Sequence, residues 1–107
     1  MAEIEFSEWQ KFDLRVGQIK EVNDHPNADK LYVMKVDIGE KTIQLVAGIK
    51  PYYPKEKLVN KKIIVFTNLK PKDFRGVMSE GMLLAADGED VGVLTVDKDS
   101  KVGSKIR

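Results

Sequence analysis

The sequence contains no cysteine and only one histidine, His25. The absence of cysteine excludes disulfides and thiolate metal sites, and one histidine cannot build a multi-histidine zinc site within a chain. No apolar run approaches the roughly 20 residues that a membrane-spanning helix needs. The acidic start, with Glu3, Glu5 and Glu8, is typical of neither a signal peptide nor a transit peptide. The default expectation is a cytoplasmic protein with no metal or other cofactor.

The same shortages argue against an enzyme. With no cysteine, one histidine, no phosphate-binding glycine loop and no paired-acid motif, the usual constellations for hydrolysis or group transfer cannot be assembled. We therefore predict no catalytic residue. For His25, which precedes Pro26, we expect a place in a surface loop, and for Asp13 a structural hydrogen bond near Arg15.

Basic side chains are concentrated in one quarter of the chain, although the net charge is only +1. Residues 50–75 hold eight cations against two anions, net +6, whereas residues 1–49 sum to −3 and residues 76–107 to −2. A phosphate-binding face needs such a concentration. The alternative is that these lysines lie around the domain as ordinary solvated charge.

Turn formers separate short segments of alternating apolar residues, which predicts an all-β domain. Ser7 and Gln10 form a capping-box pattern, so we expect a helical turn from about Glu8 to Lys11. The strand that follows shows a slip at Gly17, which predicts a bulge or bend. Further strands are expected at residues 31–38, 42–47, 63–66, 82–86 and 91–96, and residues 97–107 could add a short one.

Five or more short strands, with one long insert between the third and fourth, describe a small Greek-key barrel of the OB type. An SH3-like barrel is the chief alternative, because periodicity alone does not separate the two. We interpret residues 1–107 as a single domain with an N-terminal turn (1–11) and a C-terminal extension (97–107). Trp9 and Phe12 are expected either to plug one end of the barrel or to form part of a subunit contact.

The segment from Leu69 to Gly76 is predicted to be a basic loop that carries the binding surface. It combines Lys70, Lys72 and Arg75 with one aromatic ring, Phe74. Cations interleaved with a ring suit a charged polymer with flat bases. Phe74 either stacks on an unpaired base or packs under the loop.

Four motifs, in order, resemble the OB-fold tRNA-binding domain. They are residues 12–17 (FDLRVG), 25–31 (HPNADKL), 46–49 (VAGI) and 75–82 (RGVMSEGM). That domain occurs at the C-terminus of methionyl-tRNA synthetases, as a free-standing tRNA-binding protein and in synthetase-associated cofactors. The resemblance covers residues 6–107, and four ordered motifs are more specific than any one of them.

The resemblance implies a non-catalytic, homodimeric module that binds tRNA by shape and assists an aminoacyl-tRNA synthetase, with methionyl-tRNA synthetase as the first candidate. It would act as the C-terminal domain of that enzyme or as a separate beta subunit, and Met1 favours a separate polypeptide. Dimer contacts are expected around Trp9 and residues 102–106, with their geometry left open because residues 96–103 lack the prolines of many members. The expected RNA contacts are Asn27, Lys30, Arg75, Ser79 and Met82 from the resemblance, and Lys72 and Phe74 from the basic loop.

These predictions have alternatives. Asn27 is of a type that caps its own turn in such loops, and Met82 begins an apolar strand and would then be core. Tyr52 and Tyr53 are more readily explained as braces of their proline-bounded loop than as RNA contacts. At the level of function, the alternatives are a free-standing general tRNA-binding protein, a protein-interaction module of a synthetase complex, and a binder of single-stranded DNA.

Overall fold

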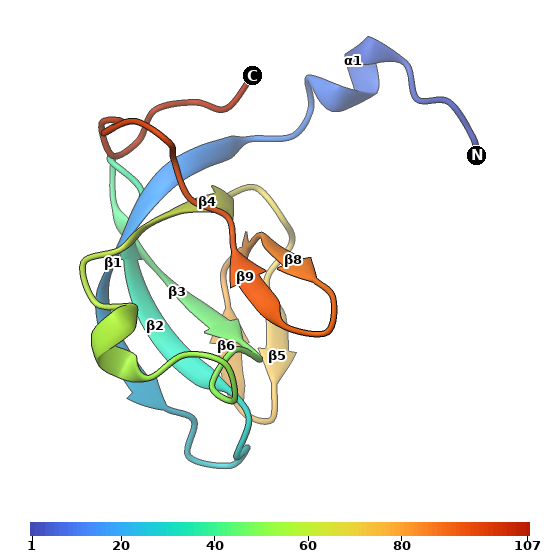
Figure 1. Cartoon of the computed structure of the whole chain (residues 1–107). Helices are drawn as coiled ribbons and strands as arrows, with labels where there is room; N and C mark the ends of the chain where they lie inside the picture. The colour runs from blue at the N-terminus through green and yellow to red at the C-terminus, as the bar shows by residue number, and fades with distance from the viewer.

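A curved five-stranded antiparallel sheet forms the centre of the structure, a computed structural model that describes all residues 1–107 (Figure 1). The strand order is β3-β2-β1-β4-β7. Its strands are β1 (Leu14–Asp24), β2 (Tyr32–Asp37), β3 (Thr42–Ala47), β4 (Lys62–Phe66) and β7 (Met82–Leu83). Two hairpins accompany the sheet: β5 (Lys72–Phe74) with β6 (Val77–Ser79), and β8 (Ala85–Asp87) with β9 (Val91–Val93).

The two edges of the sheet meet between β3 and the chain that enters β7. The backbone N–H of Glu80 donates to the carbonyl oxygen of Gln44 at 2.8 Å, and the N–H of Val46 donates to Ser79 Oγ at 3.0 Å. These bonds nearly close the sheet into a barrel, which is how small all-β domains protect their edges. The predicted all-β, five-stranded OB-type barrel is confirmed.

Strand β1 serves two apolar clusters because its burial pattern changes at Gly17. Val16 and Gly17 are both buried, and a Cβ atom on Gly17 would lie 2.8 Å from Val36 Cγ1 and 2.9 Å from Val65 Cγ2. A side chain there would collide with the barrel interior, so the strand needs glycine. The predicted slip is confirmed, although the register shift against β2 lies later, between Ile19 and Glu21.

The larger cluster fills the barrel, and its most deeply buried side chains include Ile19, Met34, Leu45 and Ile63. The smaller cluster, on the opposite face of β1, consists of Leu14, Val16 and Ile64. Ile106 of the C-terminal extension and Val96, the residue before the extension, pack against that smaller cluster.

The C-terminal extension runs beside β1 without becoming a strand. The N–H of Val16 donates to the carbonyl of Ser104 at 2.9 Å, and the N–H of Ile106 donates to the carbonyl of Leu14 at 2.8 Å. Only one isolated bridge forms, between Arg15 and Lys105. The additional short strand considered for residues 97–107 is therefore not formed, and the extension pairs with β1 through single backbone hydrogen bonds.

Several local expectations are corrected. Helix α1 spans Phe6–Trp9 with Glu5 at its N-cap and no side-chain capping bond, so the capping box predicted at Ser7 is wrong. The strand expected at 82–86 is split between β7 and β8, and β9 ends at Val93. The insert between β3 and β4 contains a single 3-10 turn, Lys55–Lys57.

Neither helical element reaches the length and apolarity that a membrane crossing requires.

Candidate nucleic-acid interface

The predicted basic loop is a β-hairpin, which corrects the expectation from the sequence. Strands β5 and β6 pair Lys72 with Ser79 and Phe74 with Val77, so Arg75 and Gly76 form a two-residue turn. Both turn residues have positive φ, 53° and 95°, as a type I′ turn requires. The hairpin therefore presents its side chains from a defined frame.

The hairpin and the segment before it carry three cations that make no ion pair: Lys70, Lys72 and Arg75. All three side chains belong to exposed residues. Cations without a carboxylate partner are free to bind phosphate, because no existing pair has to be broken. The hairpin also carries one carboxylate, Asp73, whose Oδ1 accepts from the Gly76 N–H at 3.0 Å, so the element keeps a net positive charge.

Three of the five other cations in the +6 segment are neutralised by ion pairs. Lys50 and Lys55 both bind Asp24, at 3.1 Å and 3.3 Å, and Lys62 binds Asp99 at 2.7 Å. These pairs lower the pKa of Asp24 and of Asp99, mainly through the lysine hydrogen bonds. Three lysines of the segment are therefore ordinary paired charge, whereas Lys57 and Lys61, like the hairpin cations, make no ion pair.

A groove of about 250 Å³ lies against the hairpin and collects four of the seven predicted contact residues: Lys72, Phe74, Ser79 and Met82. Lys72 Nζ lies 5.1 Å from the centroid of the Phe74 ring, within cation–π range. Phe74 is half-buried and lines the groove. Met82 is 43% exposed, which rules out the alternative of a core residue.

Ser79 has a structural role that the sequence did not reveal. It is 3% exposed, and its hydroxyl accepts from the Val46 N–H and donates to the carbonyl of Gly81 at 2.8 Å. The single hydroxyl hydrogen of Ser79 is therefore already donated within the protein. Ser79 shapes the groove floor and joins the hairpin to β3.

Of the three other predicted contacts, Arg75 lies in the turn of the hairpin, and Asn27 and Lys30 lie in the loop between β1 and β2. Asn27 is exposed, and its Nδ2 donates to the carbonyl oxygen of Arg75 at 3.1 Å, so it ties this loop to the turn of the hairpin. Lys30 is exposed in the same loop and makes no ion pair. The loop and the hairpin therefore form one surface, which matches the general use of these two loops for binding in OB folds.

His25 is not the surface residue that the sequence predicted. It is 6% exposed, its Nδ1 accepts from the N–H of Asn27 at 2.9 Å, and its Nε2 lies 2.6 Å from the carbonyl oxygen of Phe74. The bond to Phe74 crosses 49 residues of sequence, so no local pattern could have announced it. The turn formers around His25 predicted only the bend.

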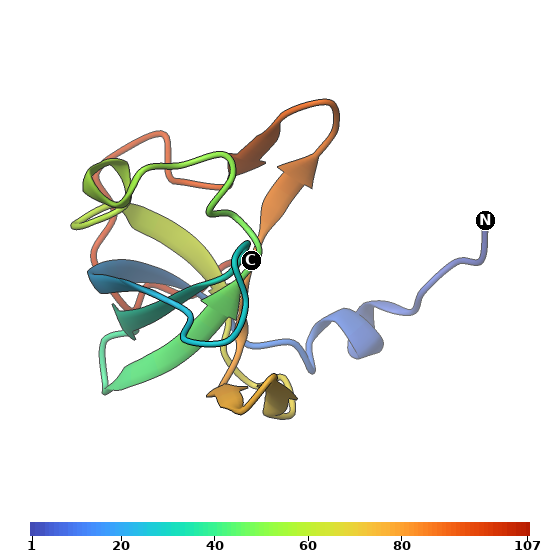
Figure 2. The same cartoon turned by 90° about the horizontal axis from the view of Figure 1, so that it is seen from below.

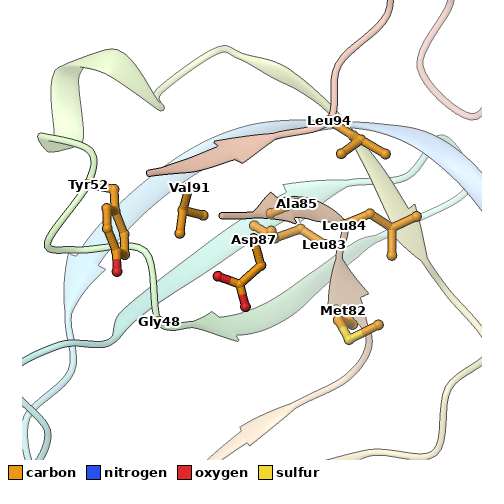
Figure 3. A pocket seen from close by; sticks show the side chains of 9 residues that line it. All are labelled: Gly48, Tyr52, Met82, Leu83, Leu84, Ala85, Asp87, Val91 and Leu94. Atoms are coloured by element: carbon orange, nitrogen blue, oxygen red, sulfur yellow. The ribbon is translucent and has the colours of Figure 1, made fainter. Parts of the chain in front are cut away.

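A larger hollow of about 580 Å³ lies next to the groove and shares Met82 with it (Figure 3). Tyr52 stands at one end and Met82 at the other, with Asp87 between them. The turn beside it carries Asp87, Glu89 and Asp90, none of them in an ion pair. Because these carboxylates repel phosphate, the smaller basic groove is the better candidate for nucleic acid.

The two neighbouring tyrosines have different environments. The Tyr53 hydroxyl accepts from the N–H of Val93 at 3.0 Å, and its carbonyl accepts from the Tyr32 hydroxyl at 2.7 Å, so Tyr53 braces its loop as expected. Tyr52 is 45% exposed and lines the larger hollow.

A second exposed apolar surface lies on the N-terminal arm, which projects away from the barrel (Figures 1 and 2). Phe6 is 69% exposed and Trp9 37% exposed. Phe12 stacks on Phe66 with 5.0 Å between ring centroids. A hollow of about 240 Å³ separates this arm from Ile106 and its neighbours. Helix α1 therefore lies off the barrel, whereas Phe12 stays in contact with it through Phe66.

The ion pair between Asp13 and Arg15 lies on β1 and the residue before it, away from the groove. Arg15 Nε donates to Asp13 Oδ1 at 2.9 Å, which lowers the pKa of Asp13 and raises that of Arg15. The structural role predicted for Asp13 is confirmed. No cluster of three or more His, Asp or Glu side chains is placed to hold a metal ion.

Comparison with known proteins identifies the family of the chain. The family model described as "Putative tRNA binding domain" matches residues 14–105. Methionine–tRNA ligases from Pyrococcus horikoshii and Methanocaldococcus jannaschii are 56% and 51% identical to the chain over its whole length. The chain spans only 15% and 17% of those two relatives.

Two solved structures have the same fold. The MetRS-related protein from Pyrococcus horikoshii has a TM-score of 0.93 and 36% identity, with 100% of both chains covered. The CsaA chaperone protein from Picrophilus torridus has a TM-score of 0.90 and 38% identity, covering 98% of this chain and 100% of that one. The family model matches residues 14–105, and the relatives are similar to this chain over its whole length. The chain therefore belongs to the tRNA-binding domain family.

Proposed function

We propose that the chain is a non-catalytic module that binds tRNA by shape, through the β5–β6 hairpin and its groove. One observation carries this proposal: three cations without ion pairs lie on or beside one hairpin, and one of them, Lys72, lies 5.1 Å from the centroid of a half-buried aromatic ring. Phosphate contacts position a protein on nucleic acid without reading its sequence. Such a surface therefore suits recognition of tRNA shape.

Each residue of the surface has a distinct part. Arg75, at the tip of the hairpin, offers a planar guanidinium for bidentate contact with phosphate, and Lys30, Lys70 and Lys72 add charge around it. Phe74 and Met82 line a groove that can take one unpaired base by stacking and apolar contact. Asn27 and Ser79 hold the surface in shape through the bonds described above.

The partner that we propose is an aminoacyl-tRNA synthetase, with methionyl-tRNA synthetase first. The support is the similarity to a segment of methionine–tRNA ligases that are much longer than this chain. The module would act in the cytoplasm as the C-terminal domain of that enzyme or as a separate beta subunit. A free-standing tRNA-binding protein is the alternative, supported by the full coverage of two solved chains of similar length.

We also propose that the module is a homodimer. The exposed Phe6 and Trp9, on an arm that leaves the barrel, and the hollow beside Ile106 support this assignment. Large apolar side chains gathered on one surface are typical of a protein contact.

The test is a titration of mixed tRNAs at several salt concentrations, with single-stranded DNA as competitor. We expect Lys72→Gln and Arg75→Gln each to weaken binding several-fold and to reduce the slope of log affinity against log salt by about one. Lys57→Gln is the matched control, because Lys57 belongs to the same basic segment but lies in the 3-10 turn.

The proposal fails if the chain does not bind tRNA, or if the two hairpin changes have no more effect than the control. Equal competition by single-stranded DNA would favour the DNA-binding alternative. A partner protein that is retained after nuclease treatment, from a chain that does not bind tRNA, would favour a protein-interaction module.

A further inference from the structure

His25 is a buried polar residue to which the proposed tRNA contacts assign no part. Its two ring nitrogens face different partners: Nδ1 faces the N–H of Asn27 at 2.9 Å, and Nε2 faces the carbonyl oxygen of Phe74 at 2.6 Å. Asn27 belongs to the same loop as His25, whereas Phe74 is the last residue of β5. One imidazole thus joins the loop between β1 and β2 to the hairpin.

These partners determine the tautomer. A backbone N–H can only donate, so Nδ1 must present its lone pair to Asn27. A carbonyl oxygen can only accept, so Nε2 must carry the proton and donate it to Phe74. The arrangement is satisfied by the neutral Nε2–H imidazole alone, since a protonated ring has no lone pair for Asn27.

The hairpin is held at both ends by other parts of the chain. At its base, Ser79 bonds to Val46, and the Gln44 side-chain amide donates to the carbonyl of Met78 at 2.8 Å. At its tip, His25 holds the carbonyl of Phe74 and Asn27 holds the carbonyl of Arg75. An isolated two-stranded hairpin of this length has marginal stability in water. The tip therefore depends on the loop for its orientation.

We propose that His25 is a positioning residue for tRNA binding, because its Nε2–H bond to the Phe74 carbonyl holds the hairpin tip in place. This inference rests on the proposed function and names a residue that supports the site without contacting RNA. A surface already held in its binding geometry loses less conformational entropy on association than a mobile one. The held carbonyls belong to Phe74 and Arg75, so the tether fixes the backbone of the two residues that are proposed to contact RNA.

Two substitutions separate the two bonds of the imidazole. In His25→Gln, the side-chain amide nitrogen takes the approximate position of Nε2 and can still donate to Phe74, but no acceptor faces Asn27. In His25→Asn, the side-chain oxygen takes the approximate position of Nδ1 and can accept from Asn27 in an Asx turn. The asparagine is too short to reach Phe74.

The first readout is tRNA affinity. We expect His25→Gln to stay within about twofold of the unmodified chain and His25→Asn to lose about fivefold or more, the effect of one lost hydrogen bond. A larger loss of affinity in His25→Gln than in His25→Asn would show that the bond to Asn27 within the loop matters more than the bond to Phe74, and would overturn the tether. Equal losses in both variants would overturn it as well, because packing of the ring would then account for the effect.

The second readout needs no RNA. Amide hydrogen exchange over residues 72–79, measured by NMR on the free chain, should become about fivefold or more faster in His25→Asn and stay nearly unchanged in His25→Gln. The amides of the β8–β9 hairpin, which His25 does not bond, are the internal control. Unchanged exchange at residues 72–79 in His25→Asn would overturn the tether. If the unmodified chain does not bind tRNA, the proposed function fails, and the exchange experiment still decides whether the tether exists.

Discussion

A Cβ atom placed on Gly39 would lie only 2.8 Å from the Cα atom of Gly103. Both glycines have positive φ, +102° and +90°, and Gly103 also donates its N–H to the carbonyl of Val16 at 2.8 Å. This backbone contact fixes the C-terminal extension between the end of β2 and β1. It explains how eleven residues with little regular structure stay attached to the barrel.

Gly39→Ala should therefore destabilise the fold by about 2–3 kcal/mol, because it combines a left-handed backbone with a collision against backbone atoms. Gly92→Ala is the matched control, since a Cβ there meets no atom within 4 Å. Urea denaturation of both variants provides the measurement. Similar midpoints for the two variants would contradict the close contact.

Ser79→Ala should cost about 1–3 kcal/mol of stability, because it leaves the Val46 N–H and the Gly81 carbonyl without their buried partner. Ser100→Ala is the control, since the Ser100 hydroxyl makes only an exposed bond, 3.2 Å long, to the carbonyl of Lys98. Chemical denaturation measures both. A Ser79→Ala variant as stable as the control would contradict the structural role and would return Ser79 to the candidate RNA contacts.

Phe74→Leu tests the ring in the groove. Leucine keeps an apolar side chain in the groove but removes the flat surface, so tRNA affinity should fall about fivefold or more. The salt dependence should not change, because no charge is removed. Tyr52→Leu, in the hollow beside the acidic turn, should leave affinity unaltered. A larger loss of affinity from Tyr52→Leu than from Phe74→Leu would contradict this assignment and would place base stacking in the larger hollow beside Tyr52.

Phe6→Ser tests the proposed homodimer. Phe6 is 69% exposed, so the change should leave the barrel intact while it weakens association about tenfold or more. Light scattering over a concentration series measures the mass. Val59→Ser, at a residue that is 39% exposed elsewhere on the surface, is the control and should keep the dimer. A monomeric unmodified chain would refute the assignment directly.

The ion pair between Asp13 and Arg15 makes stability depend on acid pH. The hydrogen bond from Arg15 lowers the pKa of Asp13 below its ordinary value of 3.8. A lowered folded-state pKa means that the stabilisation is fully present above about pH 3.8 and is lost as pH falls through the folded value. NMR titration should show the Asp13 pKa rising toward the ordinary value in Arg15→Gln, whereas the pKa of Asp24, lowered by Lys50 and Lys55, stays unchanged. An Asp13 that titrates alike in both proteins would contradict the pair.

Strand β2 shows which parts of the fold a sequence can predict. Its alternation places Tyr32, Met34 and Val36 inside, and all three are buried, because a period of two follows from burying one face of a strand. Strand β3 was predicted with the bounds that it has. The helical turn was predicted at Glu8 to Lys11 but lies at Phe6–Trp9, because Glu5 and not Ser7 occupies the N-cap in the folded chain.

Strand periodicity and turn chemistry predict the all-β class, because both are local properties of the chain. The four ordered motifs, which are also local, indicate the OB-type barrel and the family. The sequence also named Lys72, Phe74 and Met82, which share one groove. The folded structure was needed to show which lysines are paired, that the Ser79 hydroxyl is bonded internally, and that His25 holds the carbonyl of Phe74. These facts depend on contacts between residues far apart in the chain, and such contacts exist only after the barrel has closed.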